Sequence, residues 1–379
     1  TTNNNRDQGM NFEFSEEQQM LRDQARSYLT QHCPTTLVRR VLNNRETHDA
    51  DLYKGIAEMG WTATTIPEEY GGLGMSHLEL VVIAEELGRA CAPVPFSSTV
   101  YLAAEAIMAL GTEAQKQAWL PKLADGSAIG CFALGEAGGA VTPDQISTSI
   151  ADGVITGTKV PVADGGIADV AIVVCKSDGG DGATLALVDL SQDAVTKDNV
   201  QMIDFSRGHS ELTFNGACAE VLGEEGAGWA AVESLMNSAA ILFAWEQIGL
   251  ADKALEQARE YALGRFAFGR SIASYQAIKH KLAKMYVKNT LARSNAYYGA
   301  WALNAGASDL AVAAATSRVA AIQASLFAAE ENIQTHGGMG FTWEFDCQFY
   351  YRRAKLLSLA VGSEKQWQGR LVDGLAASA

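Results

Sequence analysis

The first part of the chain repeats its apolar positions with the period of an α-helix. The segment FSEEQQMLRDQARSYL has apolar residues every three to four positions, as one face of a helix requires. Its Ser–x–x–Gln pattern at Ser15 predicts a helix start closed by reciprocal hydrogen bonds. The segments DLYKGIAEMGW and LELVVIAEELGRACA have the same period, and the breaker-rich stretch PEEYGGLG separates them. We therefore predict a helical domain over 10–120.

Between residues 121 and 222 the pattern becomes that of β-strands. Two of the runs, ISTSIA and VITGTKV, flank an Asp–Gly pair, which is typical of a two-residue hairpin turn. Several short strands in so small a segment indicate a barrel or a sandwich. The runs alternate apolar and polar residues or are rich in β-branched residues, and they read AIGCFAL, ISTSIA, VITGTKVPV, ADVAIVV, ATLALVDL and ELTFNGA.

From 223 to 379 the chain again has long, Ala-rich amphipathic stretches. Two breaker-containing segments, GRSIASYQA at 269–277 and HGGMG at 336–340, interrupt them. Strands and helices do not alternate along the chain, which argues against a doubly wound sheet. The sequence predicts an α+β protein of several domains, with an N-terminal helical domain, a middle β-barrel over 121–222 and a C-terminal helical bundle over 223–379.

Composition narrows the class of protein. The chain is 48% hydrophobic and 19% charged, values of a soluble globular protein and not of a disordered one. Its net charge of −15 disfavours nucleic acid and anionic membranes as partners. Six scattered cysteines without a CxxC pair indicate reduced thiols and no zinc site. No apolar run suggests a membrane span, and the first nine residues resemble a vector remnant.

The negative charge is unevenly distributed. Residues 253–293 carry nine basic residues against two glutamates, a local net charge of 9 − 2 = +7. Two interpretations remain open at this point: a solvated helical face, or a site for a phosphate-bearing ligand.

Several motifs, in order, resemble the acyl-CoA dehydrogenase family from residue 10 onward. The family implies an N-terminal helical domain, a middle β-barrel, a C-terminal four-helix bundle, and tetramers with FAD at a subunit interface. Its members convert an acyl-CoA to a 2-enoyl-CoA with a glutamate as base. For this chain the resemblance implies a cytoplasmic enzyme, with electron-transfer flavoprotein as the expected electron acceptor. The motifs are PEEYGGLGMS, FALGEAGG, GTKVPVADGGIAD, RFAFGR, YQAIKH and QTHGGMGFTWE.

The resemblance implies two groups of FAD-binding residues. Arg265 offers donors for a pyrophosphate, Phe268 offers a flat face for adenine, and glycines in the HGGMG segment let backbone approach a ligand. This group would bind the ADP half of an FAD held mainly by a neighbouring subunit. Its members are Arg265, Phe268, Ile272, Gln276, Gln334, Gly337 and Gly338; the flavin-side candidates are Phe132, Leu134, Gly135, Ala163 and Ser363.

The sequence departs from the family where the chemistry takes place. The usual catalytic glutamate falls on Val361, and the alternative base position of another branch falls on Ala239, with Ala240 beside it. Family residues that flank the flavin ring are also replaced: the Trp by Pro161, the neighbouring Thr by Ala163, and the Thr and Ser of the Thr–Glu–Pro segment by Gly135 and Ala140.

Three hypotheses follow. The chain is one subunit of a heteromeric enzyme, as in the bacterial subfamily that works as α2β2 complexes on bulky CoA esters such as steroid side chains. Alternatively, it is self-sufficient with Glu246 as a displaced base, because Glu246 lies two helical turns from Ala239 on the same side. The third hypothesis is a flavin- or CoA-binding member of the fold without dehydrogenation.

Overall fold

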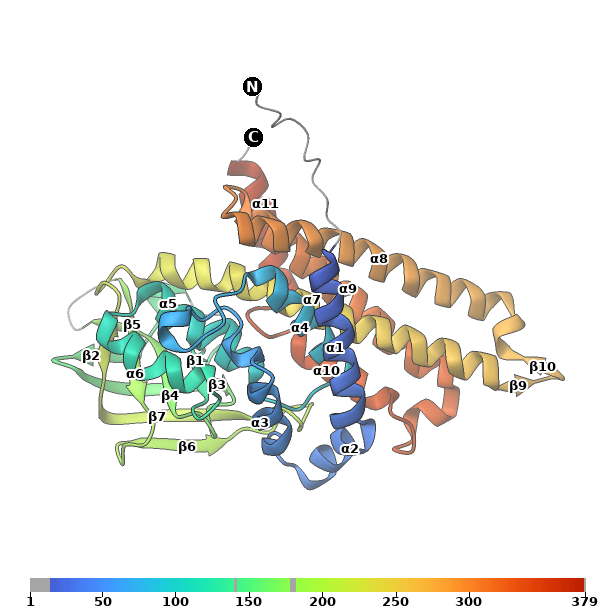
Figure 1. The fold of residues 1–379 in the computed structure, drawn as a ribbon, viewed down its shortest axis with the longest axis horizontal. Helices are drawn as coiled ribbons and strands as arrows, with labels where there is room; N and C mark the ends of the chain where they lie inside the picture. The colour runs from blue at the N-terminus through green and yellow to red at the C-terminus, as the bar shows by residue number, and fades with distance from the viewer. Residues whose placement is uncertain (1–13, 140–141, 178–181, 378–379) are drawn as a thin grey trace, which may run out of the picture.

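The computed structural model describes residues 14–139, 142–177 and 182–377. The predicted vector remnant and Ala140 lie outside these ranges. The predicted order of helices, strands and helices is confirmed (Figure 1).

The N-terminal segment is helical, as predicted. The predicted cap is present: Ser15 accepts a hydrogen bond from Gln18 N, and the Gln18 side chain accepts one from Ser15 N. The buried π-helix η3 (Ser97–Ala104) leads directly into α5. The α-helices here are α1 (Glu16–His32), α2 (Thr35–Asn44), α3 (Ala50–Glu58), α4 (His77–Arg89), α5 (Glu105–Leu110) and α6 (Glu113–Ala124).

The middle segment forms one mixed sheet. Its strands pair in the order β6-β7-β3-β2-β4-β5-β8, and β1 pairs in parallel with β4. The predicted hairpin is confirmed, because β2 and β3 pair around Asp152 and Gly153, both with positive φ. The strands are β1 (Gly130–Ala133), β2 (Ser149–Ala151), β3 (Val154–Ala163), β4 (Val170–Ser177), β5 (Ala183–Asp189), β6 (Val195–Asn199), β7 (His209–Cys218) and β8 (Glu220–Leu222).

Strand β4 is apolar along most of its length because both of its faces are buried. Val170, Ile172 and Val174 belong to the large helical core. Ala171 and Val173, which point the other way, belong to the separate core of the sheet. A strand covered on both faces reads as a continuous apolar run, so β4 couples the sheet to the helices.

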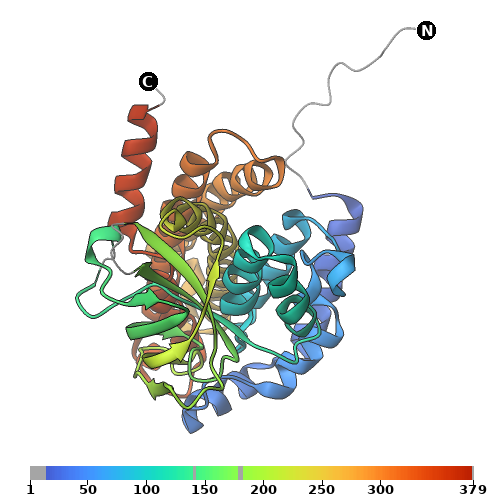
Figure 2. The same ribbon diagram turned by 90° about the vertical axis from the view of Figure 1, so that its left-hand side faces the viewer.

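The C-terminal segment consists of long helices. Figure 1 shows α7, α8 and α9 running along the molecule, with the β9–β10 hairpin at the end opposite the sheet. Figure 2 shows α11, in red, and the N-terminal helices, in blue, on opposite sides. The elements are α7 (Gly228–Gly264), β9 (Phe266–Ala267), β10 (Arg270–Ser271), α8 (Gln276–Ala305), α9 (Leu310–His336), α10 (Cys347–Leu357) and α11 (Glu364–Ala377).

One helical stretch corrects the expectation that no apolar run is long enough to span a membrane. Residues Leu310–Phe341 are long and apolar enough to cross a membrane, but half of the most apolar window is buried inside the protein. Helix α9 packs against α7, α8, α10 and α11, so its apolar character is explained by the bundle core.

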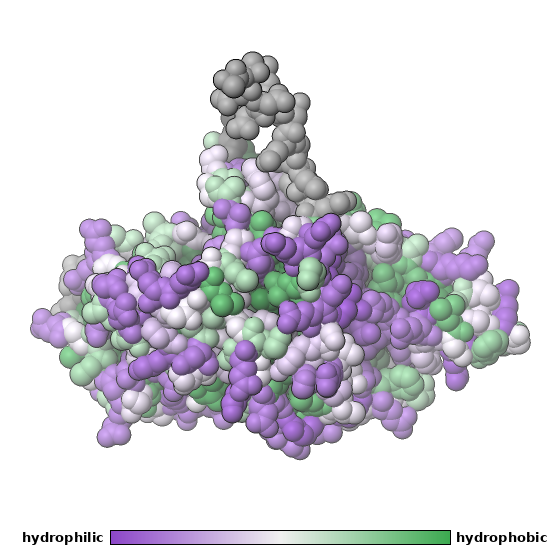
Figure 3. Space-filling view, in the orientation of Figure 1, coloured by the Kyte–Doolittle hydropathy of each residue, from purple (hydrophilic) through white to green (hydrophobic). Residues whose placement is uncertain are grey.

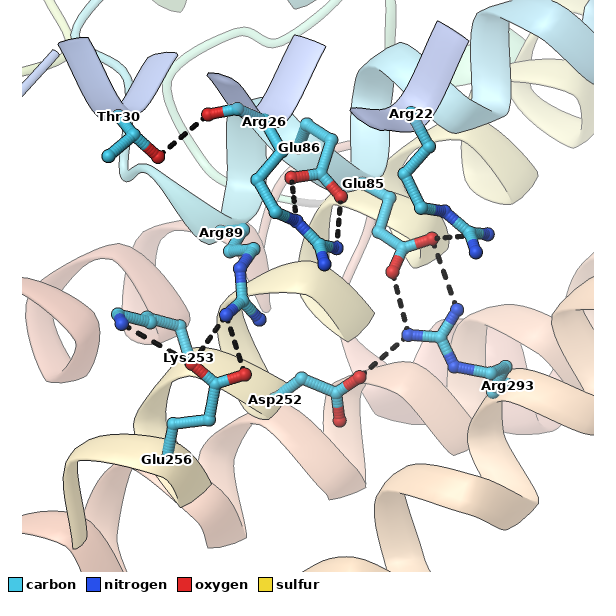
Figure 4. A network of polar contacts seen from close by, with 10 residues as sticks. All are labelled: Arg22, Arg26, Thr30, Glu85, Glu86, Arg89, Asp252, Lys253, Glu256 and Arg293. Atoms are coloured by element: carbon cyan, nitrogen blue, oxygen red, sulfur yellow. Dashed lines mark hydrogen bonds and ion pairs between the residues drawn. The ribbon is translucent and has the colours of Figure 1, made fainter. Parts of the chain in front are cut away.

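Ion pairs and close backbone contact fix the N-terminal helices on the bundle. Arg293 of α8 pairs with Glu85 of α4 at 2.8 Å and with Asp252 of α7 at 2.6 Å (Figure 4). A Cβ at Gly88 would lie 1.8 Å from the Glu246 carbonyl oxygen, and a Cβ at Gly249 would lie 1.9 Å from that of Glu85. Helices α4 and α7 therefore cross in backbone contact, which only glycine permits.

Candidate active site

A cavity of about 690 Å³ lies between the sheet and the C-terminal helices. Its walls come from η3, the end of β1, β3, the loop that precedes β7, α7, the end of α10 and α11. On α7 the cavity residues Trp229, Val232, Met236 and Phe243 follow helical spacing and form one apolar face. A largely apolar cavity of this size suits an acyl chain or a flat aromatic ring.

All five flavin-side candidates line this cavity: Phe132, Leu134, Gly135, Ala163 and Ser363. Pro161, at the position of the family Trp, lines it as well. At Gly135 a Cβ would lie 3.0 Å from the Val160 carbonyl oxygen. The backbones of Gly135 and Val160 therefore pack closely in this part of the cavity wall. This part of the chain fits a flat ring held by backbone.

The seven ADP-side candidates do not line the cavity. Phe243 is the last cavity residue on α7, and the helix continues to Gly264, about 30 Å further at 1.5 Å per residue. Arg265 follows this helix end, and Figure 1 shows the hairpin and the sheet at opposite ends of the molecule. The two groups of candidates therefore lie toward opposite ends of α7.

The hairpin end has the features of a docking surface. Phe268 is 97% exposed and Phe266 65% exposed, and Phe268 is held at φ 52°. A Cβ added at Gly337 or Gly338 would meet nothing within 4 Å. Exposed aromatic rings on a defined turn, and glycine backbone with open space around it, are features that could contact a planar ligand.

Hydrophilic residues cover most of the molecular face shown in Figure 3, where hydrophobic residues form small areas. Large exposed apolar side chains nevertheless occur on α8, where Tyr286 is 63%, Val287 52% and Leu291 60% exposed. Exposed apolar side chains on one helix are typical of an interaction surface.

Val361, which the resemblance places at the position of the usual base, lines the cavity. It has φ 52°, an unusual conformation for a β-branched residue. The turn is held from inside: the buried Arg318 donates hydrogen bonds to the carbonyl oxygens of Leu357 and Ala360. Trp367 Nε1 donates to the Val361 carbonyl oxygen at 3.1 Å. The backbone of this turn is therefore fixed by hydrogen bonds, and the side chain on it is a valine, which binds no proton.

Glu246, the displaced base of the second hypothesis, is not among the residues that line the cavity. It lies one helical turn beyond Phe243 and is 3% exposed. Its carboxylate faces Arg207 Nη1 at 3.7 Å and Arg353 Nη1 at 3.8 Å. Burial raises the pKa of Glu246, although these arginines oppose the shift. Ala239, two turns earlier on α7, is also absent from the cavity wall.

The inner end of the cavity is polar, which the sequence patterns did not indicate. Arg207 lines it with 6% of its side chain exposed. Its Nη2 donates to Ser97 Oγ at 2.6 Å and to Asp164 Oδ2 at 3.3 Å, and Ser98 Oγ donates to the same carboxylate oxygen at 2.6 Å. The signal available in the sequence was slight: Arg207 is the only arginine in residues 121–222.

The carboxylates that line the cavity lie at its solvent side. Among the described lining residues these are Glu233 and Asp373, both exposed. Arg370 lies 3.9 Å from Glu233. The inner part of the cavity wall thus has an arginine and a histidine, His209, but no carboxylate among the residues that the structure describes.

The loop that carries Leu134 and Gly135 is anchored by an ion pair. Lys159 is fully buried, and its Nζ donates to Glu136 Oε1 at 2.6 Å and to the Leu134 carbonyl oxygen at 3.2 Å. Glu136 also accepts hydrogen bonds from the backbone nitrogens of Ser147 and Thr148. Burial raises the pKa of Glu136, but the donors outweigh it and lower that pKa to about 2.

This fold and cavity define a flavin-dependent acyl-CoA dehydrogenase. Residues 15–127 match the acyl-CoA dehydrogenase N-terminal domain, and residues 226–371 match the acyl-CoA dehydrogenase C-terminal domain. The chain belongs to the acyl-CoA dehydrogenase family, an enzyme family whose cofactor is FAD.

Individual relatives place it near bacterial members. It is 34% identical to the acyl-CoA dehydrogenase IpdE2 of Mycobacterium tuberculosis, over 89% of this chain and 91% of that protein. The ChsE4–ChsE5 complex from Mycobacterium tuberculosis includes a chain with TM-score 0.87 and 26% identity, covering 97% and 99%. A variant of the Tcur3481–Tcur3483 steroid ACAD gives TM-score 0.86 and 28% identity, covering 96% and 98%.

Proposed function

We propose that the chain is one subunit of a heteromeric acyl-CoA dehydrogenase that converts a bulky acyl-CoA thioester, such as one with a steroid side chain, to its 2-enoyl-CoA. The observation that carries this proposal is that Val361, which the resemblance places at the base position, lines the cavity. A valine accepts no proton, so the α-proton of the substrate would be removed by a residue of another chain.

The separation of the two FAD-side groups supports a shared cofactor. The cavity group would hold a flavin ring within this chain, and the hairpin group, with Arg265 and Phe268, would contact the ADP part of an FAD bound mainly to the partner. When bound, FAD supplies the hydride acceptor for the Cβ hydrogen. The residues of this chain would orient the ligands and keep water from the apolar cavity.

The relatives support the same arrangement. Two of the similar solved structures are described by two chain names each, and one of those is described as a steroid enzyme. We propose a cytoplasmic heterotetramer with electron-transfer flavoprotein as the electron acceptor. The exposed apolar side chains of α8 would lie within that assembly.

The test is co-expression with an acyl-CoA dehydrogenase-type partner that retains the catalytic glutamate. We expect flavin content and turnover with electron-transfer flavoprotein to rise together, and the glutamate-to-glutamine variant of the partner to keep flavin but lose turnover. The chain expressed alone is the control. Stoichiometric FAD and full turnover in the chain alone would refute the heteromeric proposal.

A further inference from the structure

The polar inner end of the cavity has donors that the protein itself does not use. A guanidinium group has five N–H donors. In Arg207, Nη2 is hydrogen bonded, whereas Nη1 reaches only the Glu246 carboxylate at 3.7 Å, beyond hydrogen-bond distance. Its Nε has no hydrogen bond within the described part of the chain. Because Nε has no surface that a ligand in the cavity could reach, the two Nη1 donors are the ones expected to meet an acceptor when a ligand fills the cavity.

The surroundings of Arg207 are electrically balanced. Two of its neighbours, Ser97 and His209, carry no charge. Burial lowers the pKa of His209, so its imidazole is neutral near pH 7. A further anion at this end would be a buried charge without a partner, which is unfavourable. An uncharged oxygen meets the donors without that penalty. The charged groups of the cluster are three arginines, Arg207, Arg318 and Arg353, and three carboxylates, Asp164, Asp204 and Glu246.

The rest of the cavity restricts what carries this oxygen. Phe243, Met236 and Leu102 line the wall with apolar surface. A ligand that reaches Arg207 therefore has an apolar body, and it has an oxygen acceptor at the end that lies deepest in the cavity. Two sources have this chemistry: an acyl group with a ketone or hydroxyl remote from the thioester, and the carbonyl edge of a flavin ring.

We propose that Arg207 binds an uncharged oxygen, of a carbonyl or hydroxyl group, on the molecule that fills the cavity. This inference rests on the proposed function, because it assumes that an acyl-CoA and a flavin bind here. Arg207 then determines specificity: it selects ligands with an oxygen at the inner end over ligands of the same shape without one. Leaving the donors unpaired against a fully apolar ligand penalises that ligand.

The experiment uses the complex of this chain with its partner and three CoA esters: cyclohexylpropanoyl-CoA, its ring-ketone counterpart and its ring-carboxylate counterpart. Binding is compared between wild type, Arg207→Lys and the double variant R207Q/E246Q. The double variant removes one charge of each sign and so avoids an unpaired buried carboxylate. Arg293→Lys is the matched control, because Arg293 also lies between two carboxylates but outside the cavity.

If the acyl group is the source, wild type prefers the ketone ester, and both Arg207 variants lose about 10- to 100-fold of that preference with flavin content unchanged. If the flavin is the source, the variants lower flavin content or shift its absorption, and all esters are affected alike. Either result supports the proposal, provided that Arg293→Lys shows neither effect.

Two results would overturn it. Arg207 variants that match Arg293→Lys in flavin content, spectrum and ester preference would show that the guanidinium has only a structural role. A wild-type preference for the carboxylate ester would refute the uncharged acceptor. Failure of the proposed function itself would look different: either the chain alone would hold stoichiometric FAD and turn over fully, or the wild-type complex would bind neither FAD nor any of the esters.

Discussion

The buried ion pair between Lys159 and Glu136 gives the most quantitative prediction. Lys159→Met keeps the length of the side chain and removes its charge. Glu136 then loses its shortest ionic partner, at 2.6 Å, but keeps the hydrogen bonds from Ser147 and Thr148. Because Lys159 also holds the Leu134 carbonyl oxygen, the loop that forms the flavin side of the cavity loses a contact as well.

The size of the effect follows from the carboxylate. Its pKa falls from 4.5 to about 2 on folding, and 2.5 units would correspond to about 3 kcal/mol. Solvent screening of the partly exposed carboxylate reduces this value. The pKa of Lys159 is lowered too, because its burial outweighs the attraction of Glu136, and this is a further reason to expect less. We expect Lys159→Met to reduce the free energy of unfolding by about 2 kcal/mol.

The assay is urea unfolding at several pH values. Since folding depresses the pKa of Glu136, its stabilising contribution is present above about pH 4.5 and is lost as the pH falls toward 2. The difference between wild type and Lys159→Met should shrink over that range. The double variant K159M/E136Q leaves no unpaired charge and should recover part of the loss. A difference that is independent of pH, with no recovery in the double variant, would refute the electrostatic reasoning.

Three further predictions concern the same architecture. Phe268→Ala should lower flavin content of the complex several-fold without changing its melting temperature, because the ring is 97% exposed; a drop in melting temperature would indicate a packing role instead. Glu246→Gln should destabilise the chain by roughly 2 kcal/mol through loss of the charge that faces Arg207 and Arg353, while turnover per flavin in the complex stays within about tenfold of wild type; loss of all turnover in a folded complex would restore Glu246 as a base. Gly88→Ala should destabilise by at least 2 kcal/mol, since its Cβ would lie 1.8 Å from a backbone oxygen of α7, whereas Gly264→Ala, with nothing within 4 Å, is the control; equal melting temperatures would contradict the close helix crossing.

Much of the fold could be predicted because local patterns and burial agree. The Ser15 cap, the Asp–Gly hairpin and the strand-rich middle segment were all readable. Two strands of the middle sheet were missed for a physical reason. β6 (Val195–Asn199) is a partly exposed edge strand of largely polar residues, and β8 (Glu220–Leu222) is only three residues long, so neither produces a hydrophobic period.

The candidate site was only partly predictable. Cavity residues such as Leu134 and Ala163 were predicted because they lie in the motifs FALGEAGG and GTKVPVADGGIAD. Such motifs indicate segments whose backbone has a fixed position. Glu246 was expected to face the ligand because helical spacing places it on the side of Ala239. Spacing fixes the direction around an axis but not where along the axis the cavity ends, and α7 extends past that end.

The sequence by itself determined the order of helical and strand segments and the family, and it predicted Val361 at the base position, because these depend on residue type and local period. Only the tertiary structure showed that the two groups of FAD candidates lie at opposite ends of α7 and that Arg207 closes the cavity with unused donors. These facts arise from contacts between η3, the sheet and α7. Such residues are far apart along the chain, and no local pattern records how close together folding brings them.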